Sequence, residues 1–241
     1  RFRGDGDNQK DILNGLIKGF SLLAGAVAEV YSIVRLSLFV SVFATAVSVA
    51  IGVPLGSLIA IKKFPAKKIV ISLVNTGMGL PPVVVGLVAM LLLSRNGPLG
   101  FLGWLYTPAG MVLAQVVIAT PVITGLSMSA MQSLDRKFYL QMLTLGAGQW
   151  QAVRVCLWEV KLPILAAVIA GFGSVISEVG AVMMVGGNIR HQTRVLTTAT
   201  VMETHMGNFD TAIALGLILL GLTFLINMAL TFIQQQKARA E

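Results

Sequence analysis

Long apolar segments constrain the fold of this 241-residue chain more than any other feature. Crossing the hydrocarbon core of a bilayer takes about 20 helical residues. To within several residues, the segments of that length are Val34–Ile61, Ile69–Leu93, Pro108–Met128, Pro163–Met184 and Thr211–Ile233. Only 12% of the residues are charged and 56% are hydrophobic, whereas a soluble domain carries about 25% charged residues. The sequence therefore predicts an all-α integral membrane protein.

The first 30 residues are predicted to form a separate part of the chain. Arg1–Asn8 is polar and glycine-rich, and it lacks an initiator Met. Leu16–Val30 is shorter than a span and is interrupted by Lys18 and Glu29, so we expect an interfacial helix that lies along the membrane. A sixth span at this place is the alternative. The transmembrane domain then occupies residues 31–241, with a long insert at residues 131–162.

Basic residues predict the orientation of the spans. Four lysines lie within Lys62–Lys68, so this short loop is expected in the cytoplasm. Alternation then places the insert and the C-terminus in the cytoplasm, and the N-terminus and the loops 94–107 and 185–210 outside. Arg190 and Arg194 lie outside, against the usual bias. Because the basic residues sit at the ends of apolar runs, we attribute the net charge of +8 to topology rather than to nucleic-acid binding.

Two of the predicted spans contain features that a simple anchor does not need. Gly79, Pro81 and Pro82 interrupt helical hydrogen bonding in the second span, and such breaks are tolerated only where protein or a water-filled cavity covers them. This span is either a kinked packing helix or a helix that lines a pathway. The fourth span holds Glu178 about fifteen residues from its start, and acids at membrane depth are costly and usually functional.

The sequence contains no arrangement of residues that is typical of an enzyme active site. It has no glycine-rich loop followed by Lys-Ser/Thr, so ATP cannot bind by the usual phosphate cradle. His191 and His205 lie fourteen residues apart without a cysteine or carboxylate cluster, and the single Cys156 excludes an intrachain disulfide. We expect no catalytic site, metal or cofactor in this chain, and the energy for any transport must come from elsewhere.

The insert contains amphipathic sequence that predicts a docking surface for a cytosolic partner. Leu140–Pro163 reads LQMLTLGAGQWQAVRVCLWEVKLP, far longer than a turn between spans requires. Trp150, Val153, Leu157 and Val160 recur at helical spacing and form one stripe. In one interpretation, a helix over 147–158 seats this stripe in a groove of the partner. In the other, the stripe packs on the chain's own helix ends.

The insert resembles the EAA loop of ABC-importer permeases, in which a Leu-Gly pair precedes an amphipathic helix and a Leu-Pro pair. Here these pairs are Leu145-Gly146 and Leu162-Pro163. Two departures are Leu140-Gln141-Met142 in place of Glu-Ala-Ala, and a Gly-to-Pro interval about one helical turn longer than usual. The blocks VNTGMGLPPVVVGL, LLLSRNGPLG, YTPAGMVLAQV and SEVGAVMMVGGNIRHQTRVLTTA are similar to the tungstate-type permeases, relatives of the molybdate and sulfate permeases.

This resemblance covers residues 29–236 and implies a type I ABC importer permease. Such a permease would have five transmembrane helices, the interfacial helix and a cytoplasmic coupling helix. It would form a homodimer in a prokaryotic plasma (inner) membrane, surrounded by lipid. Its partners would be two ATPase subunits, which bind ATP and magnesium, and an extracytoplasmic oxyanion-binding protein. Molybdate or sulfate is the alternative substrate, and an ion-coupled secondary transporter is a weaker alternative because no internal repeat is visible.

The resemblance and the physical argument together single out three sets of residues. The set expected to couple to the ATPase is Leu145, Gly146, Ala147, Gly148, Trp150, Val153, Arg154, Leu157, Leu162 and Pro163. The set expected along the translocation pathway or gate is Asn75, Thr76, Gly79, Pro81, Pro82, Ser177, Glu178, Gly180 and Asn188. Arg190 and Arg194 are expected at the outer mouth, where they would attract anions or meet the binding protein.

Glu178 needs a separate argument because tungstate and molybdate are dianions. An ionised carboxylate that faced their path would repel them. We therefore expect backbone amides, hydroxyls or an arginine to satisfy Glu178, which then supports the fold or the gate rather than the anion.

Overall fold

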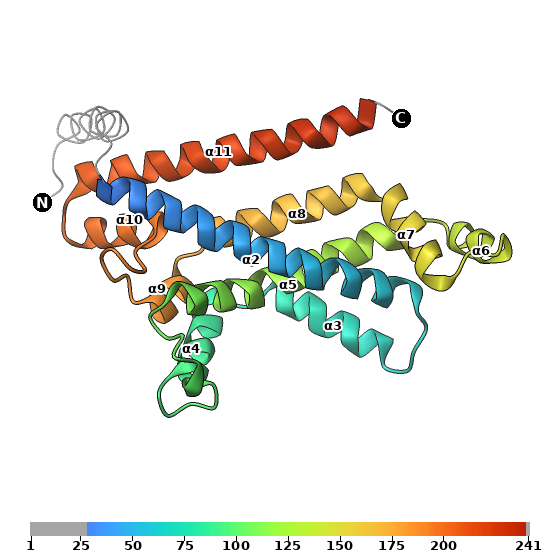
Figure 1. Ribbon diagram of the computed structural model, residues 1–241, viewed down its shortest axis with the longest axis horizontal. Helices are drawn as coiled ribbons and strands as arrows, with labels where there is room; N and C mark the ends of the chain where they lie inside the picture. Colours follow the sequence, from blue (N-terminus) through green and yellow to red (C-terminus); the bar gives the residue numbers. More distant parts are fainter. Residues whose placement is uncertain (1–27, 240–241) are drawn as a thin grey trace, which may run out of the picture. The chain divides into compact units, whose positions relative to one another are not determined.

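The computed structural model describes residues 28–239, which are helical and contain no strand. The helices are α2 (Ala28–Ile61), α3 (Lys67–Met78), α4 (Pro82–Leu93), the short 3₁₀ helix η1 (Gly100–Leu102), α5 (Pro108–Gln132), α6 (Arg136–Thr144), α7 (Gln149–Glu159), α8 (Lys161–Ile176), α9 (Gly180–Gly186), α10 (Leu196–His205) and α11 (Phe209–Arg239) (Figure 1). The predicted all-α fold is confirmed. The predicted interfacial helix lies outside the described residues, except for its last three residues, which begin α2.

Three of these helices are long and apolar enough to cross a membrane: α2, α5 and α11. Two further spans are possible if each of two bent helix pairs counts as one, namely α3 with α4 and α7 with α8. The second pair bends by 74°. The predicted number of five transmembrane segments equals the upper end of this range, but the range reaches five only by counting α7 with α8, whereas the predicted fourth segment was Pro163–Met184.

The break between α3 and α4 follows from the sequence Gly79-Leu80-Pro81-Pro82. Gly79 N–H donates to the Thr76 carbonyl at 3.1 Å, which closes a turn at the end of α3. Pro81 has no N–H to continue the helix and disfavours helical geometry at the preceding residue. Pro82 then occupies the first position of α4, where its missing N–H costs nothing.

The fourth predicted span, Pro163–Met184, is not one continuous helix, and this part of the prediction is wrong. Helix α8 ends at Ile176 and α9 begins at Gly180, so Glu178 lies in an interruption rather than within a helix. A Glu178 carboxylate oxygen accepts the N–H of Ala181 at 3.0 Å. This side-chain bond caps the start of α9 in place of a continuing helical ladder.

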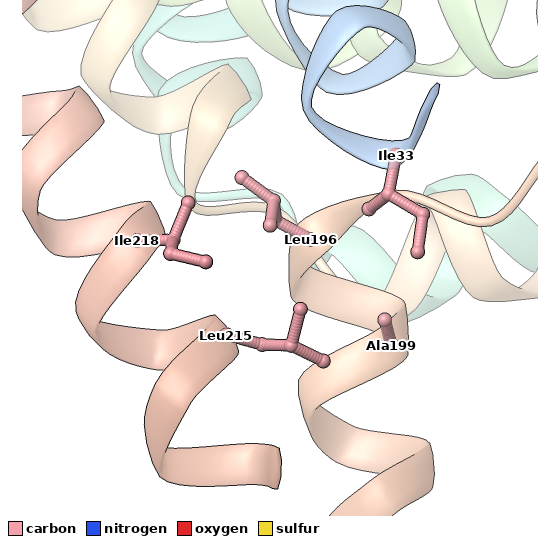
Figure 2. Close-up of a cluster of buried hydrophobic side chains, with 5 residues drawn as sticks. All are labelled: Ile33, Leu196, Ala199, Leu215 and Ile218. Carbon is pink, nitrogen blue, oxygen red and sulfur yellow. The ribbon is translucent and has the colours of Figure 1, made fainter. Parts of the chain in front are cut away.

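The described chain divides into two compact units. The first comprises residues 28–41, Pro82–Ala114 and Ile176–Ile226. Its core includes a cluster contributed by α2, α10 and α11, which Figure 2 shows as Ile33, Leu196, Ala199, Leu215 and Ile218. In the same unit α4 packs against α9 at Gly86, where an added Cβ would lie 2.6 Å from the Ala181 Cα. Glycine therefore allows the two backbones to approach at this crossing.

The second unit comprises Val42–Pro81, Gln115–Val175 and residues 227–239. The Gln115 side-chain amide donates to the Val175 carbonyl at 3.2 Å, which ties α5 to α8. A separate apolar cluster joins α5 to α7 through Ala130, Met131, Cys156 and Val160. This cluster holds the insert, α6 and α7, against the helices from which it projects.

Candidate functional site

A tight turn at Leu145-Gly146-Ala147 separates the two helices of the insert. Gly146 has φ +88°, in the left-handed region that favours glycine. Its N–H donates to the Leu143 carbonyl, and Ala147 N–H donates to the Met142 carbonyl, both at 3.0 Å. These two bonds form a Schellman motif that ends α6. The turn expected from the sequence is therefore present.

Helix α7 begins directly after this turn, at Gln149. The Gln151 side-chain oxygen accepts the N–H of Gly148 at 2.8 Å, so one of the orphan donors at the helix start is satisfied. Leu145 stands out into solvent with 79% of its surface exposed. The turn between α6 and α7 thus presents an exposed apolar side chain.

Helix α7 has two opposite faces. Ala152, Cys156 and Val160 recur every four residues and are buried, while Val153 and Leu157 are half-buried beside them. The predicted stripe of Trp150, Val153, Leu157 and Val160 does not act as one surface, because only Trp150 is exposed. The remaining members pack on the chain itself, as the alternative interpretation expects.

The exposed side of α7 includes a row of three residues, Trp150, Arg154 and Trp158, which we call the exposed face of α7. The two indoles are 73% and 72% exposed, and Arg154 lies between them one turn from each. The Lys161 ammonium lies 5.2 Å from the centre of the Trp158 ring, a cation–π distance. Sequence reasoning missed Trp158, although the Trp-Arg-Trp spacing at intervals of four residues is the signal that identifies this face.

Cys156, on the buried face of α7, is 2% exposed. Burial raises the pKa of its thiol, so the reactive thiolate is disfavoured.

Leu162 and Pro163 lie in the first turn of α8, and the Gln234 amide donates to the Leu162 carbonyl at 3.4 Å. The Leu-Pro pair therefore anchors the end of the insert.

The residues of the second predicted span that are expected along the pathway lie at an exposed break. Helix α3 has no buried residue, and Asn75, Thr76, Gly79 and Pro81 are exposed, while Pro82 is half-buried. Exposure of amide groups, hydroxyl groups and unpaired backbone N–H or C=O groups to lipid costs free energy. Chemically, this surface suits contact with water or with another protein chain.

Glu178 and Thr197 form one end of a buried hydrogen-bonded cluster. Glu178 is 9% exposed and caps α9 through Ala181, while the Thr197 hydroxyl donates to the Glu178 carbonyl at 3.0 Å. The backbone amide expected as its partner is therefore found. Ser177 is exposed and Gly180 opens α9.

Asn188, Thr193 and Thr198 form the other end of this cluster. The Thr198 hydroxyl donates to the Asn188 side-chain oxygen at 2.9 Å, and the Thr193 hydroxyl donates to the Gly186 carbonyl at 2.5 Å. Asn188 is only 8% exposed and adopts φ +50°. We name the five residues Glu178, Asn188, Thr193, Thr197 and Thr198 the α9–α10 cluster. The geometry makes Asn188 a brace of the loop that connects α9 to α10.

The two arginines expected at the outer mouth have different surroundings. Arg190 donates from Nε and Nη2 to the two carboxylate oxygens of Glu29, at 2.7 and 2.5 Å. This contact raises the pKa of Arg190. Arg194 Nη1 lies 3.7 Å from a Glu29 oxygen, and its side chain is 15% exposed. Within residues 28–239, no group of three His, Cys, Asp or Glu residues could hold a metal ion.

A family model described as "Binding-protein-dependent transport system inner membrane component" matches residues 52–239. The chain is 40% identical to the tungstate uptake system permease protein TupB of Peptoclostridium acidaminophilum, over 93% of this chain and 99% of that protein. It is 42% identical to a probable anion ABC transporter permease protein of Haloferax volcanii, over 81% and 87%.

A more distant relative is the sulfate transport system permease protein CysW of Escherichia coli K12, at 29% identity over 86% of this chain and 75% of that one. Among solved structures, an inward-facing MetNI methionine ABC transporter matches with a TM-score of 0.69 at 20% identity, covering 89% of this chain and 97% of that one.

Proposed function

Since the chain belongs to the binding-protein-dependent transport system inner membrane component family, we propose that it carries tungstate across a prokaryotic plasma membrane as the permease of an ATP-driven importer. The observation that carries this proposal is the match to a tungstate permease along nearly the whole length of both chains. The permease itself is not an enzyme. ATP and magnesium bind to separate ATPase subunits, and an extracytoplasmic protein delivers the anion.

The exposed face of α7 supplies the surface for the ATPase. Interface hot spots are enriched in Trp and Arg, and this face presents Trp150, Arg154 and Trp158 as exposed side chains. The Schellman turn at Gly146 fixes the direction in which α7 leaves α6. Closure of the two ATPases on ATP then moves α7, and with it α8, so differential ATPase contact shifts the conformational population of the spans.

The break between α3 and α4 supplies part of the pathway in a homodimer. Asn75 and Thr76 offer neutral donors on an exposed helix, and such donors suit the transient passage of a dianion better than a carboxylate does. A second copy of this chain faces the same surface across a two-fold axis. This arrangement covers polar groups that lipid would leave unsatisfied. It also provides two insert loops for two ATPases.

Molybdate or sulfate is the second candidate substrate, favoured by the sulfate and molybdenum permease relatives at 28 to 29% identity. The test is uptake into proteoliposomes that hold the purified transporter, with its binding protein and ATP, measured separately for the three anions. ATP-dependent tungstate uptake that stops without hydrolysis is the expected result. ATP-driven uptake of sulfate or molybdate alone would select the alternative, and uptake that needs an ion gradient instead of ATP would refute the importer.

The proposed orientation has the N-terminus outside and the C-terminus in the cytoplasm. Lys63 and Gln192 are both exposed, so cysteines at these positions, in a Cys156→Ser background, report the two sides. An impermeant thiol reagent applied to intact cells should label position 192 and spare position 63. The reverse pattern would invert the topology.

A further inference from the structure

A pocket of about 350 Å³ lies in the first unit between the start of α2 and the loop that precedes α10. Arg35 and Arg194 line it together with Ser32, Phe39, His191 and Gln192. Arg35 is a cation within a helix long and apolar enough to span the membrane. An ionisable side chain within a membrane-spanning helix is energetically costly and is usually functional.

The charges around this pocket are not balanced. Among the described residues, the three arginines Arg35, Arg190 and Arg194 are set against two carboxylates. Glu29 accepts two hydrogen bonds from Arg190, and Glu203 is close enough to help raise the pKa of Arg190. Arg194 reaches Glu29 only at 3.7 Å. Its Nε is buried, and no hydrogen-bond partner for it exists among the described residues. The pocket therefore keeps an excess of positive charge and an unused donor.

The donors of the pocket match a small oxyanion. A guanidinium presents parallel N–H groups that bind carboxylate, phosphate or a similar oxyanion in a bidentate manner. The Gln192 amide adds neutral donors, whereas the Ser32 hydroxyl already donates to the Glu29 carbonyl at 2.7 Å. Phe39 supplies an apolar wall, which lowers the local dielectric and strengthens the charge interaction.

We propose that this pocket, defined by Arg35 and Arg194, binds a tetrahedral oxyanion on the permease itself. Arg35 and Arg194 provide the affinity, while Arg190 serves to hold Glu29. The choice of tungstate as the natural ligand rests on the proposed function. A lipid phosphate carries the same tetrahedral oxygen chemistry, and the apolar wall at Phe39 would accommodate the first part of an acyl chain.

The test is binding to the purified permease–ATPase complex in maltoside detergent, without nucleotide or binding protein. Dissociation constants for tungstate are obtained from the shift of the thermal unfolding midpoint with ligand concentration. Arg35→Gln and Arg194→Gln are each expected to weaken binding about tenfold or more, because each removes a charged hydrogen bond. Arg194→Lys keeps the charge but loses the paired N–H donors of the guanidinium. Its affinity for tungstate should therefore lie between those of the wild type and Arg194→Gln. Arg35 is exposed, so its variant remains informative if Arg194→Gln fails to assemble.

The matched control is Arg95→Gln, which removes an exposed arginine from the loop after α4, outside the pocket. It should bind tungstate as the wild type does. Phosphatidylglycerol retention, measured by native mass spectrometry on the same variants, identifies the source of the oxyanion. Loss of tungstate binding assigns the pocket to the free anion, and loss of lipid retention alone assigns it to a lipid phosphate.

If Arg35→Gln and Arg194→Gln bind both tungstate and phosphatidylglycerol as the wild type does, the proposed oxyanion site is refuted. Uptake assays separate this outcome from a failure of the proposed function. If the wild-type transporter imports tungstate while both variants bind normally, only the pocket is refuted. If the wild type imports none of the three oxyanions, the proposed function fails whatever the pocket binds.

Discussion

The exposed face of α7 and the α9–α10 cluster differ in whether the described chain covers their side chains. Trp150 and Trp158 are more than 70% exposed, and the polar partners of Glu178 and Asn188 are buried within the chain. A large exposed aromatic pair outside the apolar spans marks an interaction site, whereas a buried hydrogen-bonded cluster fixes local structure. The exposed face of α7 is therefore the surface we propose for a partner. The α9–α10 cluster makes its hydrogen bonds within the chain, although Asn188 Nδ2 has no hydrogen-bond partner among the described residues.

This difference separates two experimental readouts. Changes on the exposed face of α7 should alter coupling to the ATPase and leave stability of the permease nearly intact. Changes in or beside the α9–α10 cluster should alter stability first, and transport only as a consequence. The following variants test that separation in order of expected effect.

The largest effect is expected from Trp150→Ala combined with Trp158→Ala. Truncation of a Trp hot spot costs about 2 kcal/mol or more of binding free energy, so ATPase association should weaken by more than about a hundredfold. Exposed positions change folding stability by only about 0.5 kcal/mol. Co-purification of the ATPase and thermal unfolding of the permease measure the two quantities. Phe101→Ala is the control, since Phe101 is 82% exposed in η1, far from the insert in sequence. Equal ATPase retention in all three proteins would remove the assignment.

Gly86→Ala should cause the next largest effect, on stability. The new Cβ would lie 2.6 Å from the Ala181 Cα, and overpacking of this kind costs about 1 to 3 kcal/mol. Gly221→Ala in α11 meets no atom within 4 Å and should be neutral or stabilise the protein by up to about 1 kcal/mol. The thermal unfolding midpoints of the assembled complexes give the comparison. A Gly86→Ala midpoint at or above that of Gly221→Ala would show that α4 and α9 do not depend on this close approach.

Glu178→Leu should destabilise the protein by about 1 to 3 kcal/mol, because the Ala181 N–H loses its acceptor in a buried place. Glu178→Gln retains an acceptor oxygen and should keep most of the stability. Neither the ATPase response nor the preference between tungstate and molybdate should change in Glu178→Gln. A changed anion preference at normal stability would place Glu178 in contact with the substrate.

The smallest effect is expected from Gly146→Ala. Its φ of +88° imposes about 1 kcal/mol of strain on a residue with a Cβ. Gly207→Ala is the matched control because Gly207 has φ +78° and, like Gly146, would place its new Cβ within 4 Å of no other atom, but it lies outside the insert. Binding-protein-stimulated ATP hydrolysis should fall in the first variant and stay at the wild-type level in the second. Equal loss of stimulation in both variants would show that the effect does not come from the turn of the insert.

The sequence predicts the class, the number of spans and the turn at Gly146 because these depend on local chemistry. Apolar length determines the spans, Pro81 and Pro82 determine the break after α3, and Gly146 permits the left-handed turn. The interruption at Glu178 depends instead on a cap and on Thr197, nineteen residues away in the chain. A continuous apolar pattern does not reveal such a long-range contact.

The orientation of α7 shows a second limit. Periodicity of three and four residues predicts an amphipathic helix, but both the Trp150–Trp158 stripe and the Ala152–Val160 stripe satisfy it. Small residues, Ala152 and Cys156, lie on the buried face because they allow α7 to approach α5 closely. Residue size, rather than hydrophobicity alone, decides which stripe is covered. Arg35 was not identified from the sequence either, because the residues that line the pocket with it come from a distant loop.

The most direct test of the central claim is a photo-crosslink from the exposed face of α7. A benzophenone group attached to cysteine at position 154, in a Cys156→Ser background, samples the groove that would receive Trp150 and Trp158. In the assembled transporter, illumination should join the permease to the ATPase, while the same group at position 192 should give no ATPase adduct. Absence of an adduct from position 154, in a complex that still hydrolyses ATP in response to its binding protein, would contradict the account.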